Sequence, residues 1–371
     1  MGRLFNRRRV AKAERQGFGL VQKLAMGDLQ EDSGYPPLFE SLPEHRSHLS
    51  RALQLRTIKL AIVMPVHNRR ETTLACLASL GRCVVQNQLF FLDVSVVVVD
   101  DGSTDGTSEA IRTRFPNVHL IQASGDLFYA AGTNLAIREA LTLDPAFVIA
   151  MNDDSLVEEQ ALLEIVRCAL AFPESIVGAL LIRWDTPDLV FQVDPRWDTF
   201  FGGWHFPQTA RISHVPDEPF AVQTIVGNFV LYPAERLSGL KTVPAGKAHF
   251  WGDVQLVRSL QRQGMRTIIC PSAIVRCEPN TLPKNLGSMQ KGEMLLTFFT
   301  SNRHPLALRP IWNSRWYSAP STLKAICAVL AQVCRLLFRM LGLGSWPDWH
   351  VRGPAFGSWK PKGASNPSNR S

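Results

Sequence analysis

Two pairs of acidic residues directly follow apolar runs of the chain. Asp100 and Asp101 end the run V-S-V-V-V-V, and Asp153 and Asp154 come soon after the run A-F-V-I-A-M. Such runs predict strands buried on both faces of a parallel sheet, and ligands bind at the carboxyl ends of such strands. Carboxylates at that edge repel phosphate, but they suit the hydrogen-bond donors of a base or ribose, or a metal that carries phosphate. The alternative for each pair is a capped turn with solvated acids.

The second acid pair has the composition of a metal site. Asn152 and Asp154 are two positions apart, which places both side chains on the same side of an extended chain. With a diphosphate and water, these two oxygen ligands would complete an octahedral Mg²⁺ or Mn²⁺ site. Such an ion acts as a Lewis acid on a departing diphosphate. The alternative is that N-D-D-S only caps a helix over Leu156–Ala171.

The elements around these acids follow a strand–helix–strand order. Ile58–Val66 predicts a first strand, Thr72–Leu80 has helical spacing, and the strand of the first acid pair follows. This order implies parallel strands joined by a right-handed crossover. Val118–Ile121 predicts a further strand. We therefore predict an α/β fold with a mostly parallel, Rossmann-like central sheet flanked by helices.

Composition limits the class of protein. The chain has 371 residues, of which 46% are apolar, so a substantial core is available. The formal charge of +8 is concentrated near both ends, which favours an anionic phospholipid surface as a partner. A nucleic-acid role is disfavoured because the basic residues form no stripe along the sheet. Seven cysteines without a C-x-x-C pair favour a reducing compartment over a disulfide framework or structural zinc.

Three stretches of the sequence resemble family 2 glycosyltransferases, particularly their rhamnosyltransferase-like branch. They are V-V-V-V-D-D-G-S-T-D-G-T, G-D-L-F-Y-A-A-G-T-N and M-N-D-D-S, and the resemblance extends over roughly Ile58–Thr300. It implies a GT-A fold, a nucleoside-diphosphate sugar as donor, Mn²⁺ or Mg²⁺ as cofactor, and inverting transfer.

The resemblance also implies roles on the nucleotide side of the site. In such enzymes the position of Asp101 binds the nucleobase, and the segment of Pro65 and His67 lines the base pocket. The position of Asp153 contacts the nucleoside or the sugar. We also place Asp126, in the G-D-L-F-Y-A-A-G loop, among the nucleotide-binding residues.

On the reaction side, the resemblance implies that Asp154 holds the metal and that Asn152 replaces the first acid of a D-x-D motif. The stretch H-F-W-G-D-V-Q-L-V-R resembles the family's E-D-x-D-L-x-x-R segment, in which the position of Asp253 is the catalytic base. Here Gly252 and Gln255 replace both neighbouring acids. The alternative for Asp253 is a helix cap.

Two further positions follow from the same resemblance. The stretch V-G-N-F-V-L-Y, at Val226–Tyr232, resembles the family's acceptor-side strand. Cys277 lies where relatives often have a histidine after the last strand. Because a thiolate is a poor ligand for hard Mg²⁺, we do not count Cys277 as a metal ligand.

A basic amphipathic helix is predicted over Ser321–Leu343. Lys324, Arg335 and Arg339 fall on one stripe, and apolar side chains occupy the remainder. The apolar run is too short to span the hydrocarbon core, so a position in the membrane interface fits better. The alternative is packing against the catalytic domain or a second subunit.

The expected organisation has four segments. They are a basic N-terminal arm (1–56), a GT-A domain (57–300), a basic amphipathic helical extension (301–350) and a disordered tail (351–371).

The sequence thus predicts an inverting glycosyltransferase of cell-surface polysaccharide synthesis. The donor suggested by the resemblance is dTDP-rhamnose, and the acceptor is a glycan or lipid-linked. We expect a cytoplasmic protein, peripheral on the inner face of the cell membrane. One alternative is a sugar nucleotidyltransferase, although Pro65–Arg70 lacks the glycines of a phosphate loop. Another is a non-catalytic, membrane-associated protein that binds nucleotide sugars.

Overall fold

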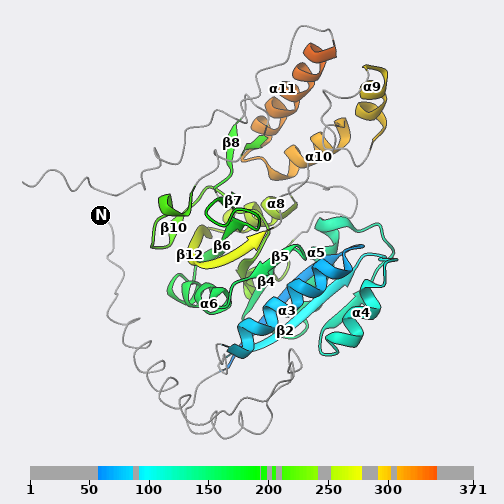
Figure 1. Cartoon of the computed structure of the whole chain (residues 1–371). Coiled ribbons are helices and arrows are strands. Elements are labelled where there is room, and N and C mark those ends of the chain that lie inside the picture. The colour runs from blue at the N-terminus through cyan, green and yellow to red at the C-terminus, as the bar shows by residue number, and fades with distance from the viewer. Residues whose placement is uncertain are drawn as a thin grey trace, which may run out of the picture.

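A large mixed sheet forms the centre of the computed structural model (Figure 1). The expected N-terminal arm and C-terminal tail lie outside the residues that the structure describes. The described residues are 57–86, 92–192, 194–198, 203–205, 211–240, 252–277, 291–301 and 307–340.

The strands of the central sheet run in the order β10-β12-β6-β11-β4-β1-β2-β3, with β5 on β12 and β7 on β6. Strand β1 is parallel to β2 and β4, and β2 is parallel to β3, whereas β11 is antiparallel to both of its neighbours. The strands are β1 (Ile58–Val66), β2 (Leu92–Asp100), β3 (His119–Gln122), β4 (Phe147–Ala150), β5 (Ser155–Val157), β6 (Ser175–Arg183), β7 (Val190–Gln192), β10 (Phe220–Ala221), β11 (Val230–Pro233) and β12 (Arg266–Cys277).

Helices cover both faces of this sheet, as Figure 1 shows. Helices α3, α4 and α6 pack on one face, and α5 and α8 pack on the other. Their bounds are α3 (Arg70–Gln86), α4 (Thr107–Arg114), α5 (Phe128–Leu141), α6 (Ala161–Ala171) and α8 (Gly252–Gln261); the short helix α7 (Ala234–Leu237) follows β11.

Strand β1 shows how the sequence produces this layered core. Leu60, Ile62 and Met64 are buried against the layer of α3, whereas Ala61 and Val63 are buried against the layer of α5. Successive side chains of a strand point to opposite faces, so a continuous apolar run is required where both faces are covered. Truncation of one of these large side chains to alanine costs about 2–5 kcal/mol.

The predicted fold class is confirmed: the protein is α/β, with a large central sheet flanked by helices and with helices at its C-terminal side. One local expectation differs. Residues 152–155 do not cap a helix that starts at Leu156, because β5 begins at Ser155 and pairs with Cys277 of β12. Helix α6 begins only at Ala161. The second acid pair therefore lies in a turn between two strands of the sheet.

A small hairpin attaches the C-terminal helices to this core. Strands β8 (Arg196–Asp198) and β9 (Gly203–His205) form a two-stranded sheet. The rings of Trp197 and Trp204 meet edge to face at 5.5 Å. The buried indole N–H of Trp204 donates to the carbonyl of Ser318, 3.2 Å away. A Cβ atom at Gly203 would lie 2.5 Å from Arg315 Nε, so the hairpin and that side chain are in close contact.

Three helices complete the described chain: α9 (Lys291–Thr300), α10 (Leu308–Ser318) and α11 (Thr322–Met340). They are grouped at one end of the molecule in Figure 1. Helix α10 contacts α8, α9 and α11. Within the described ranges, each helix is too short or too polar to be a candidate for crossing a bilayer.

Candidate functional site

The first acid pair performs two different structural tasks. Asp100, at the end of β2, accepts a hydrogen bond from the backbone N–H of Ser103 at 2.8 Å and another from the hydroxyl of Ser108. These contacts fix the turn between β2 and α4.

Asp101 instead holds the loop that leads into α5. Its carboxylate accepts hydrogen bonds from the backbone N–H groups of Gly125 (2.9 Å), Leu127 (3.0 Å) and Phe128 (2.8 Å). Gly125 and Phe128 have φ values of 96° and 56°, and these left-handed conformations turn successive N–H groups toward one acceptor. A negative charge is also favoured at a helix N-terminus. Asp101 therefore organises the loop at the expected nucleotide side.

The loop after β1 is tied to the loop after β2. His67 Nδ1 lies 2.6 Å from the carbonyl oxygen of Asp101, so Nδ1 carries the proton in this contact. Asn68, with φ at 50°, donates its backbone N–H to Ser103 Oγ at 2.9 Å, and its side-chain oxygen accepts the N–H of Thr104 at 2.7 Å. Both loops lie at the carboxyl ends of parallel strands, where the sequence predicts the base pocket.

The other two predicted nucleotide-side residues differ in exposure. Asp126 is exposed in the loop that Asp101 holds. Pro65 is partly buried under α5, where a Cβ atom at Gly132 would lie 2.8 Å from the proline Cβ. The nucleotide-binding roles of these residues stay predictions.

The second acid pair lies in residues 152–155, which we call the acid turn. One nitrogen of Arg69, Nη1, lies 2.9 Å from Asp154 Oδ2 and 3.3 Å from Asp153 Oδ1. Thr73 donates its hydroxyl proton to Asp153 at 3.0 Å. Burial raises the pKa of Asp153 to about 6; Arg69 opposes this shift, and Asp154 adds to it. Two consecutive carboxylates face one guanidinium because the chain turns here.

The acid turn also fits the oxygen chemistry of a Mg²⁺ or Mn²⁺ site. The side-chain oxygen of Asn152 is buried and has no hydrogen-bond partner. Asp154, two positions later in the chain, is also buried. Among the described residues, no three or more His, Cys, Asp and Glu side chains gather into a metal site. Mg²⁺ usually binds one or two carboxylates together with substrate phosphates and water. The residues present therefore suit a metal that arrives with a diphosphate.

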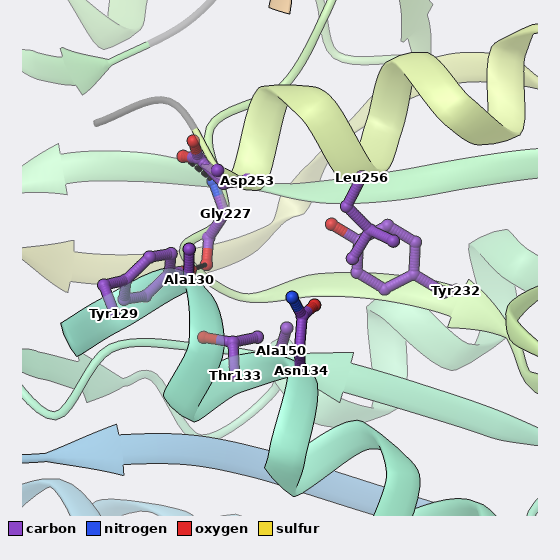
Figure 2. A pocket seen from close by; sticks show the side chains of 10 residues that line it. Tyr129, Ala130, Thr133, Asn134, Ala150, Gly227, Tyr232, Asp253 and Leu256 are labelled. Atoms are coloured by element: carbon purple, nitrogen blue, oxygen red, sulfur yellow. Dashed lines mark hydrogen bonds between the residues drawn. The ribbon is translucent and has the colours of Figure 1, made fainter. Parts of the chain in front are cut away.

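Asp253 lies in the first turn of α8, and backbone groups hold its carboxylate (Figure 2). Its Oδ2 accepts the N–H of Gly227 at 2.6 Å, and its Oδ1 accepts the N–H of Val254 at 2.8 Å. Burial raises the pKa of Asp253, and these hydrogen bonds only partly oppose the shift. The carboxylate is thus fixed in place and more basic than an ordinary aspartate.

Gly227 is crowded from two sides. Its carbonyl accepts the hydroxyl proton of Tyr129 at 2.8 Å. A Cβ atom at this position would lie 2.4 Å from Asp253 Cβ and 2.5 Å from the Tyr129 hydroxyl oxygen. Only glycine permits this approach, which explains the residue type next to the predicted base.

A small pocket opens beside Asp253, between α5, α8 and the sheet (Figure 2). Burial, and then the nearby Asp253, raise the pKa of Tyr129 and of Tyr232, so both phenols stay protonated at neutral pH. The lining residues are Tyr129, Ala130, Thr133, Asn134, Ala150, Gly227, Tyr232, Gly252, Asp253 and Leu256.

Asn228 joins this pocket to the acid turn. Its side-chain oxygen accepts the backbone N–H of Asn152 at 3.1 Å and the hydroxyl proton of Ser155 at 2.8 Å. Its side-chain nitrogen donates to the sulfur of Cys277 at 3.1 Å. We call the dipeptide Gly227-Asn228 the junction, because one of its residues holds Asp253 and the next holds the acid turn.

Hydrogen bonds and short runs of backbone therefore connect Asp101, Asp253 and the acid turn. Asp101 holds the loop that precedes Tyr129, Tyr129 contacts the junction, and the junction contacts Asp253 and Asn152. The sequence assigned no role to Arg69, Tyr129 or the junction. The only signal for the junction was its place in the V-G-N-F-V stretch, which resembles the family's acceptor-side strand.

A family comparison agrees with this arrangement. Residues 61–219 match the sequence profile of Glycosyl transferase family 2. This part of the chain is similar to that family. The matched range contains Asp101 and both acids of the acid turn, and it ends before Asp253.

Curated proteins match the chain over a short stretch. The chain is 44% identical over 46 residues to the N-acetylglucosaminyl-diphospho-decaprenol L-rhamnosyltransferases of two strains of Mycobacterium tuberculosis, CDC 1551 / Oshkosh and ATCC 25618 / H37Rv. The stretch spans 12% of this chain and 15% of each relative.

Solved structures are similar at low sequence identity. The mannosyltransferase PcManGT of Pyrobaculum calidifontis, in complex with GDP-Man and Mn²⁺, shows 16% identity and a TM-score of 0.43, over 91% of this chain and 85% of that chain. S. aureus TarS 1–349 in complex with UDP-GlcNAc shows 15% identity and a TM-score of 0.45, over 76% of this chain and 73% of that chain.

Proposed function

We propose that this chain is an inverting glycosyltransferase. It moves a sugar from a nucleoside diphosphate to a hydroxyl group of a glycan or lipid-linked acceptor. The observation that carries the proposal is the junction, which holds a basic carboxylate, Asp253, on one side and the acid turn on the other. The family 2 match over residues 61–219 supports the same activity.

Asp253 is the catalytic base in this proposal. Its carboxylate accepts the proton of the acceptor hydroxyl while the hydroxyl oxygen bonds to the anomeric carbon. The bond between that carbon and the diphosphate oxygen breaks, and the nucleoside diphosphate leaves with the electron pair. One positioned base contributes about 10²–10⁴-fold to such a rate. The raised pKa of Asp253 suits this task because a more basic carboxylate accepts the proton more readily.

The nucleotide side of the site completes the assignment. His67 and Asp101 position the nucleobase with Pro65, and Asp126 and Asp153 contact the nucleotide or its sugar. Their placement at the carboxyl edge of parallel strands supports these roles.

Asn152 and Asp154 would hold a Mn²⁺ or Mg²⁺ ion together with the diphosphate of the donor. When bound, that ion supplies positive charge that stabilises the departing diphosphate. The partnerless buried oxygen of Asn152 supports this assignment.

The donor that we propose to test first is dTDP-rhamnose, for a role in cell-surface polysaccharide synthesis. Its support is the rhamnosyltransferase-like character of the motifs together with the short stretch that is 44% identical to a mycobacterial rhamnosyltransferase. UDP- and GDP-sugars belong in the same experiment.

Nucleotide release tests the proposed activity. The protein is incubated with Mn²⁺ and dTDP-rhamnose, UDP-GlcNAc or GDP-mannose, and the released nucleoside diphosphate is measured. We expect slow release from at least one donor, because water can replace the acceptor, and loss of that release in EDTA. Tight binding of a nucleotide sugar without any release would instead favour a non-catalytic binding protein.

We further propose that the protein is cytoplasmic and docks on the inner face of the cell membrane through α9, α10 and α11. Helix α11 buries its small side chains, Ala325, Ala328 and Val329. The large apolar side chains of α11 are exposed instead, and α9 and α10 also expose large apolar side chains. The rings of Trp312 and Trp316 on α10 are stacked, with their centroids 5.4 Å apart. The exposed large apolar side chains on these helices, among the residues described, are Leu295, Leu296, Phe299, Trp312, Trp316, Leu323, Ile326, Leu330, Leu337 and Phe338.

Charge favours an anionic bilayer as the partner of this apolar face. Between residues 291 and 340 the sequence has seven Lys and Arg residues and a single acid, Glu293. That is a net charge of +6 out of the +8 of the whole chain. Apolar side chains and Trp rings enter the interface while basic side chains remain near the headgroups, as in interfacial amphipathic helices.

Vesicle binding tests this docking surface. We expect the protein to co-sediment with vesicles that contain phosphatidylglycerol and much less with phosphatidylcholine vesicles. The double change Leu323→Glu and Leu330→Glu should weaken binding at least tenfold, because each buried leucine contributes about 2 kcal/mol. The control is Leu170→Glu, an exposed leucine on α6. Equal loss in that control, or a dimer that the double change dissociates, would refute the membrane assignment.

A further inference from the structure

The side chain of Asn228 is buried, with 5% of its surface exposed, and it forms hydrogen bonds with the acid turn and with Cys277. Its oxygen accepts two hydrogen bonds from the acid turn, at Asn152 and Ser155, and its amide donates to Cys277 at the end of β12. An amide side chain has two acceptor positions on oxygen and two donors on nitrogen. Both acceptor positions of Asn228 are therefore used to hold the acid turn.

The position of Asn228 in the chain gives these contacts a consequence for the base. The preceding residue, Gly227, donates its N–H to Asp253 and accepts the hydroxyl proton of Tyr129. The following residue, Phe229, is fully buried and has φ at 57°, a conformation that its surroundings must enforce. The junction is thus held from both ends, and it cannot shift without moving the base, the acid turn or both.

We propose that Asn228 is a positioning residue that sets the distance between the acid turn and Asp253. This inference rests on the proposed function, in which the acid turn holds the diphosphate end of the donor and Asp253 takes the proton of the hydroxyl that attacks the donor's anomeric carbon. A misplacement of reacting groups by about 1 Å costs on the order of 10²-fold in rate. Asn228 therefore affects the chemical step more strongly than the binding of the donor.

Donor hydrolysis provides a test that needs no identified acceptor. Water attacks the anomeric carbon, Asp253 takes a proton from that water, and the nucleoside diphosphate leaves. For Asn228→Ala, we expect kcat for nucleoside diphosphate release from a saturating donor to fall at least tenfold. The dissociation constant for the same nucleoside diphosphate with Mn²⁺, measured by calorimetry, should stay within about threefold.

Two further variants separate positioning from general stability. Thr224→Val changes a fully buried hydroxyl that has no hydrogen-bond partner, and it should leave kcat unchanged. Ser155→Ala removes one hydrogen bond to Asn228 and only one oxygen atom, so it should fold and lower kcat about threefold. If Asn228→Ala does not fold, the kcat of Ser155→Ala tests the positioning role instead. The melting temperature of each variant is recorded alongside.

The two possible failures are distinguishable. If the unchanged protein releases no nucleoside diphosphate, the proposed function fails. If it does, but Asn228→Ala keeps the wild-type kcat or weakens nucleotide binding as much as it lowers kcat, the positioning role is wrong. A Ser155→Ala variant with full kcat would also contradict it.

Discussion

Replacement of Asp253 by asparagine is expected to lower sugar transfer by about 10²–10⁴-fold, because the amide cannot accept the proton of the attacking hydroxyl. The hydrogen bond from Gly227 should persist, since the asparagine oxygen can still accept it. Nucleotide binding should therefore stay near the wild-type level. The measurements are nucleoside diphosphate release and calorimetric binding of the nucleotide with Mn²⁺.

The stability of the same variant should depend less on pH than that of the wild type. Burial raises the folded-state pKa of Asp253 above its unfolded value, so the stability that this group contributes is fully present below the unfolded pKa. That contribution is lost as the pH rises through the folded pKa. Asparagine cannot ionise, so the melting temperature of the variant should not fall as the pH rises through the raised pKa, whereas that of the wild type should. Asparagine also leaves one of the two backbone N–H groups without an oxygen acceptor, which lowers its stability by a similar amount at every pH.

Activity should follow the opposite dependence on pH. The rate of the wild type should fall as the pH drops through the raised pKa of Asp253, because only the ionised carboxylate is a base. Glu139→Gln, which neutralises an exposed carboxylate on α5, is the matched control and should change neither rate nor stability appreciably. If Asp253→Asn turned over at the wild-type rate, the base would have to be another group.

Asp154→Ala is expected to abolish the part of nucleotide binding that depends on Mn²⁺, because it removes the one charged ligand of the proposed metal site. The loop around it should hold its shape, since Asp153 keeps its contacts with Arg69 and Thr73. Binding of UDP or dTDP should then be equally weak in Mn²⁺ and in EDTA, whereas the wild type should bind at least tenfold more tightly in Mn²⁺.

The control for this experiment is Glu109→Ala, which removes an exposed acid from α4. It tests whether loss of any negative charge alters nucleotide affinity through the general field of the protein. Undiminished Mn²⁺-dependent binding by Asp154→Ala, with the control also unchanged, would show that the metal is held elsewhere.

Much of the sheet was predictable from the sequence because both of its faces are covered. The apolar run 58–66 became β1 with the predicted bounds, and the run that ends in Asp100 became β2. The acids that follow such strands were correctly expected at one edge. Periodicity and composition carry this information, since a strand buried on both faces permits few polar residues.

Contacts between distant segments were not predictable in the same way. Arg69 meets the acid turn across 85 residues, and Tyr129 meets Gly227 across 98. Neither contact could be predicted from the neighbouring sequence, because an arginine in a loop and a tyrosine at the start of a helix are common in many folds. The turn conformation of the second acid pair was likewise determined by the pairing of Ser155 with β12.

Helix α11 shows a subtler limit. Its amphipathic character was predicted, but the side that packs on α10 was not. The packed side carries Ala325 and Ala328, because small side chains let two helices approach closely, and the leucines face away. Sequence periodicity identifies an apolar stripe without identifying its partner.

The hydrogen bonds of the site differ in how much chain they enclose. Asp101 accepts a hydrogen bond from Gly125, 24 residues away, and Asp253 accepts one from Gly227, 26 residues away. The half of the site around Asp101 and the half around Asp253 therefore each close a short loop. The hydrogen bonds that join the junction to Ser155, Asn152 and Tyr129 enclose 73 to 98 residues. Long loops cost more entropy to close, so during folding each half should become ordered separately before the two are joined.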